Sequence, residues 1–193
     1  MARRRSYQTA VPIAAVESRR LGAYLAALGR IAPEKSMDRA VRIARRCGIP
    51  LKIAAKVDPV DQDYYEQIIK PLLDPPLIEY VGEISDQEKS EFLCGAIALL
   101  VTIDWSEPFG LVMIEAMACG TPVVAFNRGS VPEIVEDDVT GYIVEDELSA
   151  ANAVKIKEGR QLAASVFYFV TACLATHCLE GKSRPSRRAT GLH

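Results

Sequence analysis

Short apolar runs alternate with amphipathic stretches through most of the chain, and this rhythm constrains the fold more than any other feature of the sequence. Six such runs lie at 24–28, 51–55, 77–81, 97–103, 122–126 and 141–144. Each has the length of a β-strand, and several carry almost no polar side chain, as is typical of parallel strands buried on both faces. The alternation therefore predicts an α/β domain with a single doubly wound parallel sheet.

Helix signals fall in the stretches between these runs. Apolar side chains recur at helical spacing over 37–47, with arginines at the positions between them, which predicts an amphipathic helix with one core face. Ser85 and Glu88 have the spacing of a capping box, in which a hydroxyl and a carboxylate bond the unpaired N–H groups of the first helical turn. Ser130 and Glu133 repeat this spacing, so we expect a further helix to begin at each serine.

The distribution of charge bounds the class of protein. The chain has 193 residues and a formal net charge of −2, and this length is enough for one well-buried domain. Residues 1–20 and 182–193 each carry a surplus of four positive charges, so the segment between them has ten more acidic than basic groups. An acidic body argues against nucleic-acid binding, which needs positive charge on a folded face. We expect a basic, disordered segment at 1–21, a domain at 22–153 and a partly helical extension at 154–193.

The five cysteines have no CxxC spacing and stand mostly in apolar surroundings. They indicate a reducing compartment, so we expect a cytoplasmic protein with neither a disulfide framework nor a metal site; a transit peptide at the Arg-rich start is a less favoured interpretation. The segment 162–179 lacks formally charged residues and reaches the lower limit of length for a membrane span. Its hydroxyl side chains and histidine favour a helix outside the bilayer, and membrane contact is kept as the weaker alternative.

A doubly wound, Rossmann-like sheet binds its ligand where the parallel strands end, so a site is expected in the loops after the runs. The first loop, 29–36, nearly matches the phosphate loop G-x-x-x-x-G-K-S, but Glu34 stands at its second glycine, where a carboxylate would repel phosphate. The loop still offers Arg30, Lys35 and a helix N-terminus to one ligand, an arrangement suited to a diphosphate. An equally weighted alternative is that Arg30 and Lys35 are ordinary surface cations that bind no ligand.

The loop and helix after the fourth run carry a stronger signal. Glu115 is the only charged residue between 108 and 127. A carboxylate in so apolar a helix needs a partner, either the hydroxyls of a ribose or a salt bridge to a lysine or arginine. Gly110 permits close approach of a ligand to its own N–H group and to that of Leu111. Glu107 either accepts sugar hydroxyls or is an acid favoured by the helix dipole.

A dense motif spans this same region. Glu107-Pro-Phe-Gly-Leu is followed, after three residues, by Glu115-Ala-Met-Ala-Cys-Gly-Thr-Pro-Val-Val-Ala. This stretch resembles the E-x7-E signature, with its following strand, of the family-4 glycosyltransferases of group 1. Elements before and after the stretch agree with that family, and the resemblance covers about residues 22–152.

The resemblance implies the donor-binding domain of a GT-B glycosyltransferase. Such a domain binds a nucleotide-sugar donor, UDP- or GDP-linked, for transfer with retention of configuration and without a cofactor or metal ion. Catalytic roles are implied for Arg30 and Lys35, which would hold the diphosphate, and for Glu107, which would contact the donor sugar. Glu115 would bind the ribose, and the base would lie near Gly82. The full set of implied donor-binding residues is Gly29, Gly82, Ile84, Phe109, Gly110, Leu111 and Glu115.

The resemblance covers only the C-terminal half of such an enzyme. The other half normally supplies the acceptor site and a catalytic histidine, whereas His177 and His193 stand in the unmatched tail. Ser36 and Ala55 replace glycines that the family pattern leads us to expect. We therefore expect a truncated or split chain that is inactive alone and needs a separate acceptor-binding domain or chain.

Three alternatives stay open beside this interpretation. An inactive fragment, or a non-enzymatic module that binds nucleotide sugars, would share the motif. A nicotinamide-dependent oxidoreductase is disfavoured because no G-x-G-x-x-G follows the first run. A membrane-tethered domain that uses 162–179 is the third alternative.

Overall fold

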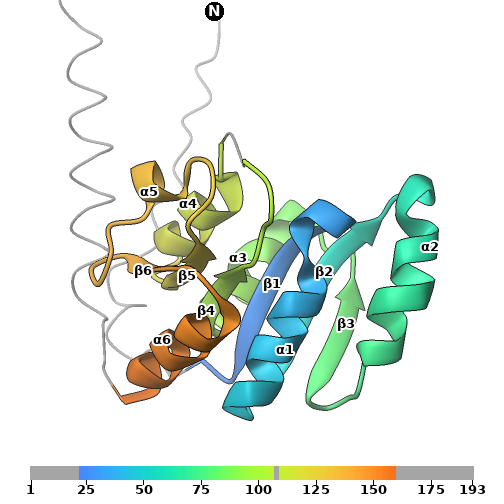
Figure 1. The fold of residues 1–193 in the computed structure, drawn as a ribbon, viewed down its shortest axis with the longest axis horizontal. Coiled ribbons are helices and arrows are strands. Elements are labelled where there is room, and N and C mark those ends of the chain that lie inside the picture. Colours follow the sequence, from blue (N-terminus) through green and yellow to red (C-terminus); the bar gives the residue numbers. More distant parts are fainter. Residues whose placement is uncertain (1–21, 107–108, 160–193) are drawn as a thin grey trace, which may run out of the picture.

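A six-stranded, all-parallel sheet forms the centre of the domain (Figure 1). The computed structural model describes residues 22–106 and 109–159, and for 156–159 the backbone alone. The strand order is β3-β2-β1-β4-β5-β6, which confirms the predicted doubly wound, Rossmann-like fold. The strands are β1 (Tyr24–Ile31), β2 (Leu51–Val57), β3 (Ile78–Gly82), β4 (Ala96–Val101), β5 (Val123–Phe126) and β6 (Gly141–Val144).

The strand order places one switch of direction at the centre of the sheet. The chain runs outward from β1 through β2 to β3, and then returns to the other side of β1 to lay down β4, β5 and β6. The loops after β1 and β4 therefore leave neighbouring strands in opposite directions. A crevice at the carboxyl ends of such strands is where doubly wound sheets bind ligands.

Helices cover both faces of the sheet (Figure 1). On one face α1 (Met37–Cys47) and α6 (Glu147–Gly159) pack against each other and share a core with Leu25 and Ala27 of β1. The intervening Ala26 points to the other core, since side chains alternate along a strand. That second core is built with α3 (Asp86–Cys94), α4 (Leu111–Ala118) and α5 (Val131–Ile134). Two buried cores explain why the strands are apolar on both faces.

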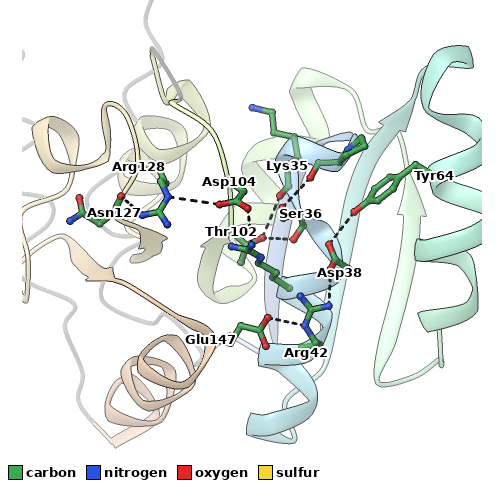
Figure 2. Close-up of polar contacts among 12 residues, drawn as sticks. Lys35, Ser36, Asp38, Arg42, Tyr64, Thr102, Asp104, Asn127, Arg128 and Glu147 are labelled. Atoms are coloured by element: carbon green, nitrogen blue, oxygen red, sulfur yellow. Dashed lines mark hydrogen bonds and ion pairs between the residues drawn. The ribbon is translucent and has the colours of Figure 1, made fainter.

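The connection from β2 to β3 is a series of short helical segments. It comprises η3 (Pro59–Asp61), α2 (Gln62–Tyr64), η4 (Tyr65–Ile69) and η5 (Lys70–Leu72), while a further short segment, η2 (Pro33–Lys35), precedes α1. The Tyr64 hydroxyl donates to Asp38 of α1 at 3.0 Å, and Arg42 bridges Asp38 and Glu147 of α6 at 2.7 and 2.8 Å (Figure 2). This polar chain joins the connection to both helices of that face.

Several predicted boundaries were wrong by a few residues. β1 continues to Ile31, so Gly29 and Arg30 end a strand and do not begin a loop. Parallel pairing with β2 continues through these residues, and Gly29 lies opposite Ala55, which is part of β2 and not of a turn. The fourth strand ends at Val101, two residues before its predicted end.

One of the two predicted capping boxes is confirmed and the other was wrong. The Glu88 N–H donates to Ser85 Oγ at 3.4 Å, and the Ser85 N–H donates to Glu88 Oε2 at 2.8 Å. Ser130 makes no such cap, because its backbone is helical (φ −76°, ψ −3°) and not extended as the cap requires. Its Oγ is buried and has no hydrogen-bond partner within the described residues.

Predictions for the two ends of the chain lie largely outside the described residues. These are the segment 1–21, the extension from 160 onward and the apolar stretch 162–179. α6 itself continues to Gly159, past the expected domain boundary at 153. Within the part of the chain that the structure describes, no helix has the length and apolar character to cross a membrane.

Candidate functional site

A pocket of about 340 Å³ opens where β1 and β4 end and α4 begins. Its walls come from the end of β1 with the turn that follows it, from the end of β4, and from the first turn of α4. Six of the predicted site residues line it: Gly29, Arg30, Lys35, Phe109, Gly110 and Leu111. The structure therefore brings together two groups of predicted site residues that are about eighty positions apart in the sequence.

Three other predicted site residues do not line the pocket, and a fourth falls outside the described residues. Gly82 ends β3, two strands from β1, and Ile84 follows it directly before α3. Glu115 lies on the second turn of α4 and does not line the pocket. Glu107 falls outside the described residues, so its prediction stays a prediction.

Arg30 is surrounded by carboxylates at the mouth of the pocket. Its Nη2 is 2.5 Å from Glu34 Oε1, and its guanidinium also lies 3.6 Å from Asp58 and 3.8 Å from Asp61. The hydrogen bond to Glu34 raises the pKa of Arg30. A hydrogen bond from the backbone N–H of Glu34 itself lowers the pKa of the Glu34 carboxylate, and the hydrogen bond from Arg30 lowers it further. Because 43% of the Arg30 side chain is exposed, a ligand anion can reach the cation and replace a carboxylate.

Hydrogen bonds fasten the turn after β1 to the end of β4 (Figure 2). Thr102 Oγ1 donates to the carbonyl of Ser36 at 2.9 Å and lies 3.5 Å from that of Lys35. The Asp104 N–H donates to the Glu34 carbonyl at 2.9 Å. Ser36 has left-handed backbone (φ 49°), which explains why a glycine was expected there. These bonds fix the position of Lys35 against β4.

The loop after β4 holds charges of both signs. The Lys35 ammonium lies 5.6 Å from the centre of the Trp105 ring, within range of a cation–π interaction. Asp104 pairs with Arg39 of α1 at 2.7 Å and is 3.9 Å from Arg128, which follows β5 (Figure 2). Asp104 thus connects the loop after β4 to α1 and to the loop after β5.

The start of α4 requires a glycine. Gly110 has left-handed backbone (φ 57°), and a Cβ there would lie 2.1 Å from Met113 Cε and 2.8 Å from Ile134 Cδ1. Among the described residues, no side chain caps the helix. The first turn of α4 lines the pocket, and N–H groups at the start of a helix can donate to an anion. Phe109 and Leu111 flank this turn and are exposed by 72% and 68%.

Glu115 has a basic partner that its own helix does not reveal. Lys89 of α3 lies 3.2 Å from Glu115 Oε1 and 2.9 Å from Asp86 Oδ1. The sequence leaves a ribose and a salt bridge as alternative partners for Glu115, and the segment around it offers no basic residue. The bridge is present, and its partner comes from the neighbouring helix.

The model of the family described as "Glycosyl transferases group 1" matches residues 16–158 of the chain. The chain belongs to this family. The match spans the whole sheet and both walls of the pocket, so the pocket is part of the family's shared domain.

Curated relatives match about 70% of the chain. A D-inositol 3-phosphate glycosyltransferase of Mycobacteroides abscessus is 32% identical over 143 residues, 70% of this chain and 32% of the relative. An uncharacterised 41.2 kDa protein in the cps region of Klebsiella pneumoniae is 28% identical over 135 residues, 70% of this chain and 36% of the relative. The chain thus corresponds to about a third of the length of these curated relatives.

Solved structures share the fold. HepE of Anabaena, in complex with UDP, has a TM-score of 0.69 and 24% identity over 81% of this chain and 44% of its own. The C-terminal domain of the group 1 protein LpcC from Francisella tularensis has a TM-score of 0.65 and 23% identity. That match covers 78% of this chain and 86% of the LpcC domain, so the shared fold is about the size of that one domain.

Two residues of the site region were missed in the sequence. Thr102 is the only hydroxyl residue in the run 97–103, and a polar side chain at the end of a buried strand is a signal that could have identified it. Lys89 gave no such signal, because its pairing with Glu115 depends on how α3 and α4 pack.

Proposed function

We propose that this domain binds the nucleoside diphosphate part of a nucleotide-sugar donor for a glycosyltransferase. The observation that carries the proposal is the convergence of Arg30, Lys35 and the uncapped start of α4 on one pocket. Two side-chain cations opposite a helix N-terminus suit a doubly negative diphosphate. The UDP complex of HepE, which has the same fold, supports a nucleotide as the ligand.

Each predicted residue then has a proposed role. Arg30 and Lys35 bind the diphosphate, and the N–H groups of Gly110 and Leu111 bind its oxygens or those of the sugar. The carboxylate of Glu115 binds the ribose. The base lies near the end of β3, beside Gly82 and Ile84, and Glu107 contacts the sugar.

The proposed reaction is transfer of the glycosyl group to an acceptor with retention of configuration and without a metal ion. As the sugar leaves, negative charge grows on the diphosphate, and Arg30 and Lys35 stabilise that charge. The E-x7-E spacing from Glu107 to Glu115 supports placement in family 4 of group 1. An acceptor-binding domain, on another segment or another chain, completes the active site, and we propose that the protein works in the cytoplasm.

Calorimetric titration of the chain with UDP, GDP and ADP tests the proposal. We expect saturable binding of UDP or GDP, and an affinity at least about ten-fold weaker for Lys35→Met, since a charge-assisted bond to phosphate is lost. Lys70→Met is the matched control, because Lys70 pairs with Glu66 on the far connection and does not line the pocket. A chain shown by circular dichroism to be folded, yet binding none of the three, would contradict the proposal.

A further inference from the structure

The ion pair between α3 and α4 lies outside the pocket, and the proposed chemistry leaves it unexplained. In the described part of the chain, Lys89 is the sole partner of the Glu115 side chain, and it contacts Oε1. The two side chains are 28% and 43% exposed. An ion pair so accessible to water contributes little to the stability of the fold. We therefore consider its effect on the position of the Glu115 carboxylate.

Lys89 is held firmly on its own helix. The confirmed capping box at Ser85 fixes the first turn of α3, and the Lys89 N–H donates to the Ser85 carbonyl at 3.0 Å. The ammonium is also bonded to Asp86 Oδ1 at 2.9 Å. Asp86 and Glu115 raise the pKa of Lys89 against the effect of its partial burial, so it stays charged near neutral pH. Glu115 therefore faces a cation that Asp86, a carboxylate of the same helix as Lys89, also contacts.

The geometry around Glu115 allows Lys89 to order the carboxylate before a ligand binds. A glutamate side chain with no partner samples several rotamers, and ordering it on binding costs free energy. Lys89 contacts Oε1 only, which leaves the second carboxylate oxygen for a hydroxyl donor. Lys89 also lies one helical turn beyond Ser85, which directly follows Ile84, so the pair joins α4 to the first turns of the helix that follows the loop after β3.

We propose that Lys89 is a positioning residue for the nucleotide: it holds the Glu115 carboxylate oriented to accept hydrogen bonds from the ribose diol. This inference rests on the proposed function of Glu115. Lys89 itself does not touch the ligand. It acts more strongly on affinity for a ribonucleotide than on affinity for the 2′-deoxy analogue, which keeps only one of the two hydroxyls.

The test compares UDP with 2′-deoxy-UDP by calorimetry on the full chain, with GDP and 2′-deoxy-GDP titrated in parallel. We expect the wild type to prefer the ribonucleotide by at least about ten-fold, as expected for a charge-assisted hydrogen bond. Glu115→Gln should lose most of that preference. Lys89→Met should lose several-fold of it, with a smaller loss of affinity for the deoxy analogue than for the ribonucleotide, and Lys89→Arg should restore it. Lys70→Met removes a more exposed lysine that is likewise paired with a carboxylate, and it should change nothing.

The possible results separate the two claims. Normal discrimination in Lys89→Met together with its loss in Glu115→Gln overturns the role of Lys89 and leaves the proposed function standing. Tighter UDP binding in Lys89→Met also overturns it, because Lys89 would then compete with the ribose. A folded wild type that binds neither UDP nor GDP overturns both claims. Lys89→Gln serves as a second neutral variant should the methionine variant not fold.

Discussion

The two walls of the pocket offer an anion the same chemistry by different means. The wall at the end of β1 presents the charged side chains of Arg30, which contacts Glu34, and of Lys35, which lies near the Trp105 ring. The wall at the start of α4 presents backbone N–H groups, placed by Gly110 and flanked by exposed apolar residues. Binding by side chains and binding by backbone are thus separated in space and in sequence.

The two walls differ in how far their binding groups also support the fold. Arg30 is at the surface, so the sheet does not depend on its side chain. Gly110 is buried, and its conformation and the space around it leave no room for a side chain. Changes at the first wall should therefore reduce binding alone, whereas changes at the second should reduce binding and stability together.

The double variant Arg30→Ala/Lys35→Ala should have the largest effect on binding. Loss of two charge-assisted contacts to phosphate is expected to weaken UDP binding by roughly 100-fold or more, while the free energy of unfolding changes by less than about 1 kcal/mol. Calorimetry and urea denaturation measure the two quantities. Arg46→Ala/Lys70→Ala removes two exposed cations outside the pocket and is the control. Equal losses of affinity in both double variants would contradict the division between the walls.

Gly110→Ala should reduce stability and binding together. The left-handed backbone and the contact with Met113 Cε are expected to lower the free energy of unfolding by about 2 kcal/mol, and the displaced first turn of α4 should weaken UDP binding. Gly48→Ala is the matched control, because Gly48 is also left-handed (φ 69°) but a Cβ there meets no atom within 4 Å. It should cost only about 1 kcal/mol and leave affinity unchanged. An equal cost at both glycines would show that the packing at Gly110 is not decisive.

Thr102→Val should loosen the connection between the walls. The isosteric change removes the buried Thr102 donor and leaves the Ser36 carbonyl with the Arg39 N–H alone, so we expect a loss of about 1 kcal/mol in unfolding free energy and a few-fold loss in UDP affinity. Thr121→Val removes a comparably buried hydroxyl, which donates to the Leu93 carbonyl at 2.6 Å on the far side of the fold from Lys35. It should lower stability by a similar amount and leave affinity intact. A matching drop in affinity would mean that Thr102 has no special effect on the pocket.

The two serines with capping-box spacing should differ in a smaller way. Ser85→Ala removes a real N-cap at the start of α3 and should cost about 1 kcal/mol. Ser130→Ala removes a buried hydroxyl that has no partner among the described residues, so its effect should be close to zero or stabilising. Chemical denaturation of both variants gives the comparison. A clear loss at Ser130 would show that its hydroxyl is bonded in solution.

Features with a local cause could be predicted from the sequence. The strands follow from continuous apolar runs, and the cap at Ser85 follows from two residues of one turn. The pocket itself was predicted because a doubly wound sheet brings the loops after β1 and β4 to one edge. The loop at 29–36 was shorter than expected because pairing with β2 extends β1.

Features that depend on packing could not be predicted. The spacing of Ser130 and Glu133 is that of a cap, but the backbone of Ser130 is already helical after the turn from β5. The pairing of Glu115 with Lys89 requires two helices to lie side by side, and no pattern within either helix encodes it. The bond from Thr102 to Ser36 joins residues 66 positions apart and likewise has no local signal.

An NMR titration of the ¹⁵N-labelled chain with UDP, compared with uridine, tests the central claim that the pocket binds the diphosphate from both walls. The account predicts that UDP shifts the amide signals of Gly110 and Leu111 together with those of Arg30 and Lys35. Uridine, which lacks the phosphates, should leave these four signals in place. Shifts by UDP confined to residues outside the pocket, or shifts of the same size with uridine, would contradict it.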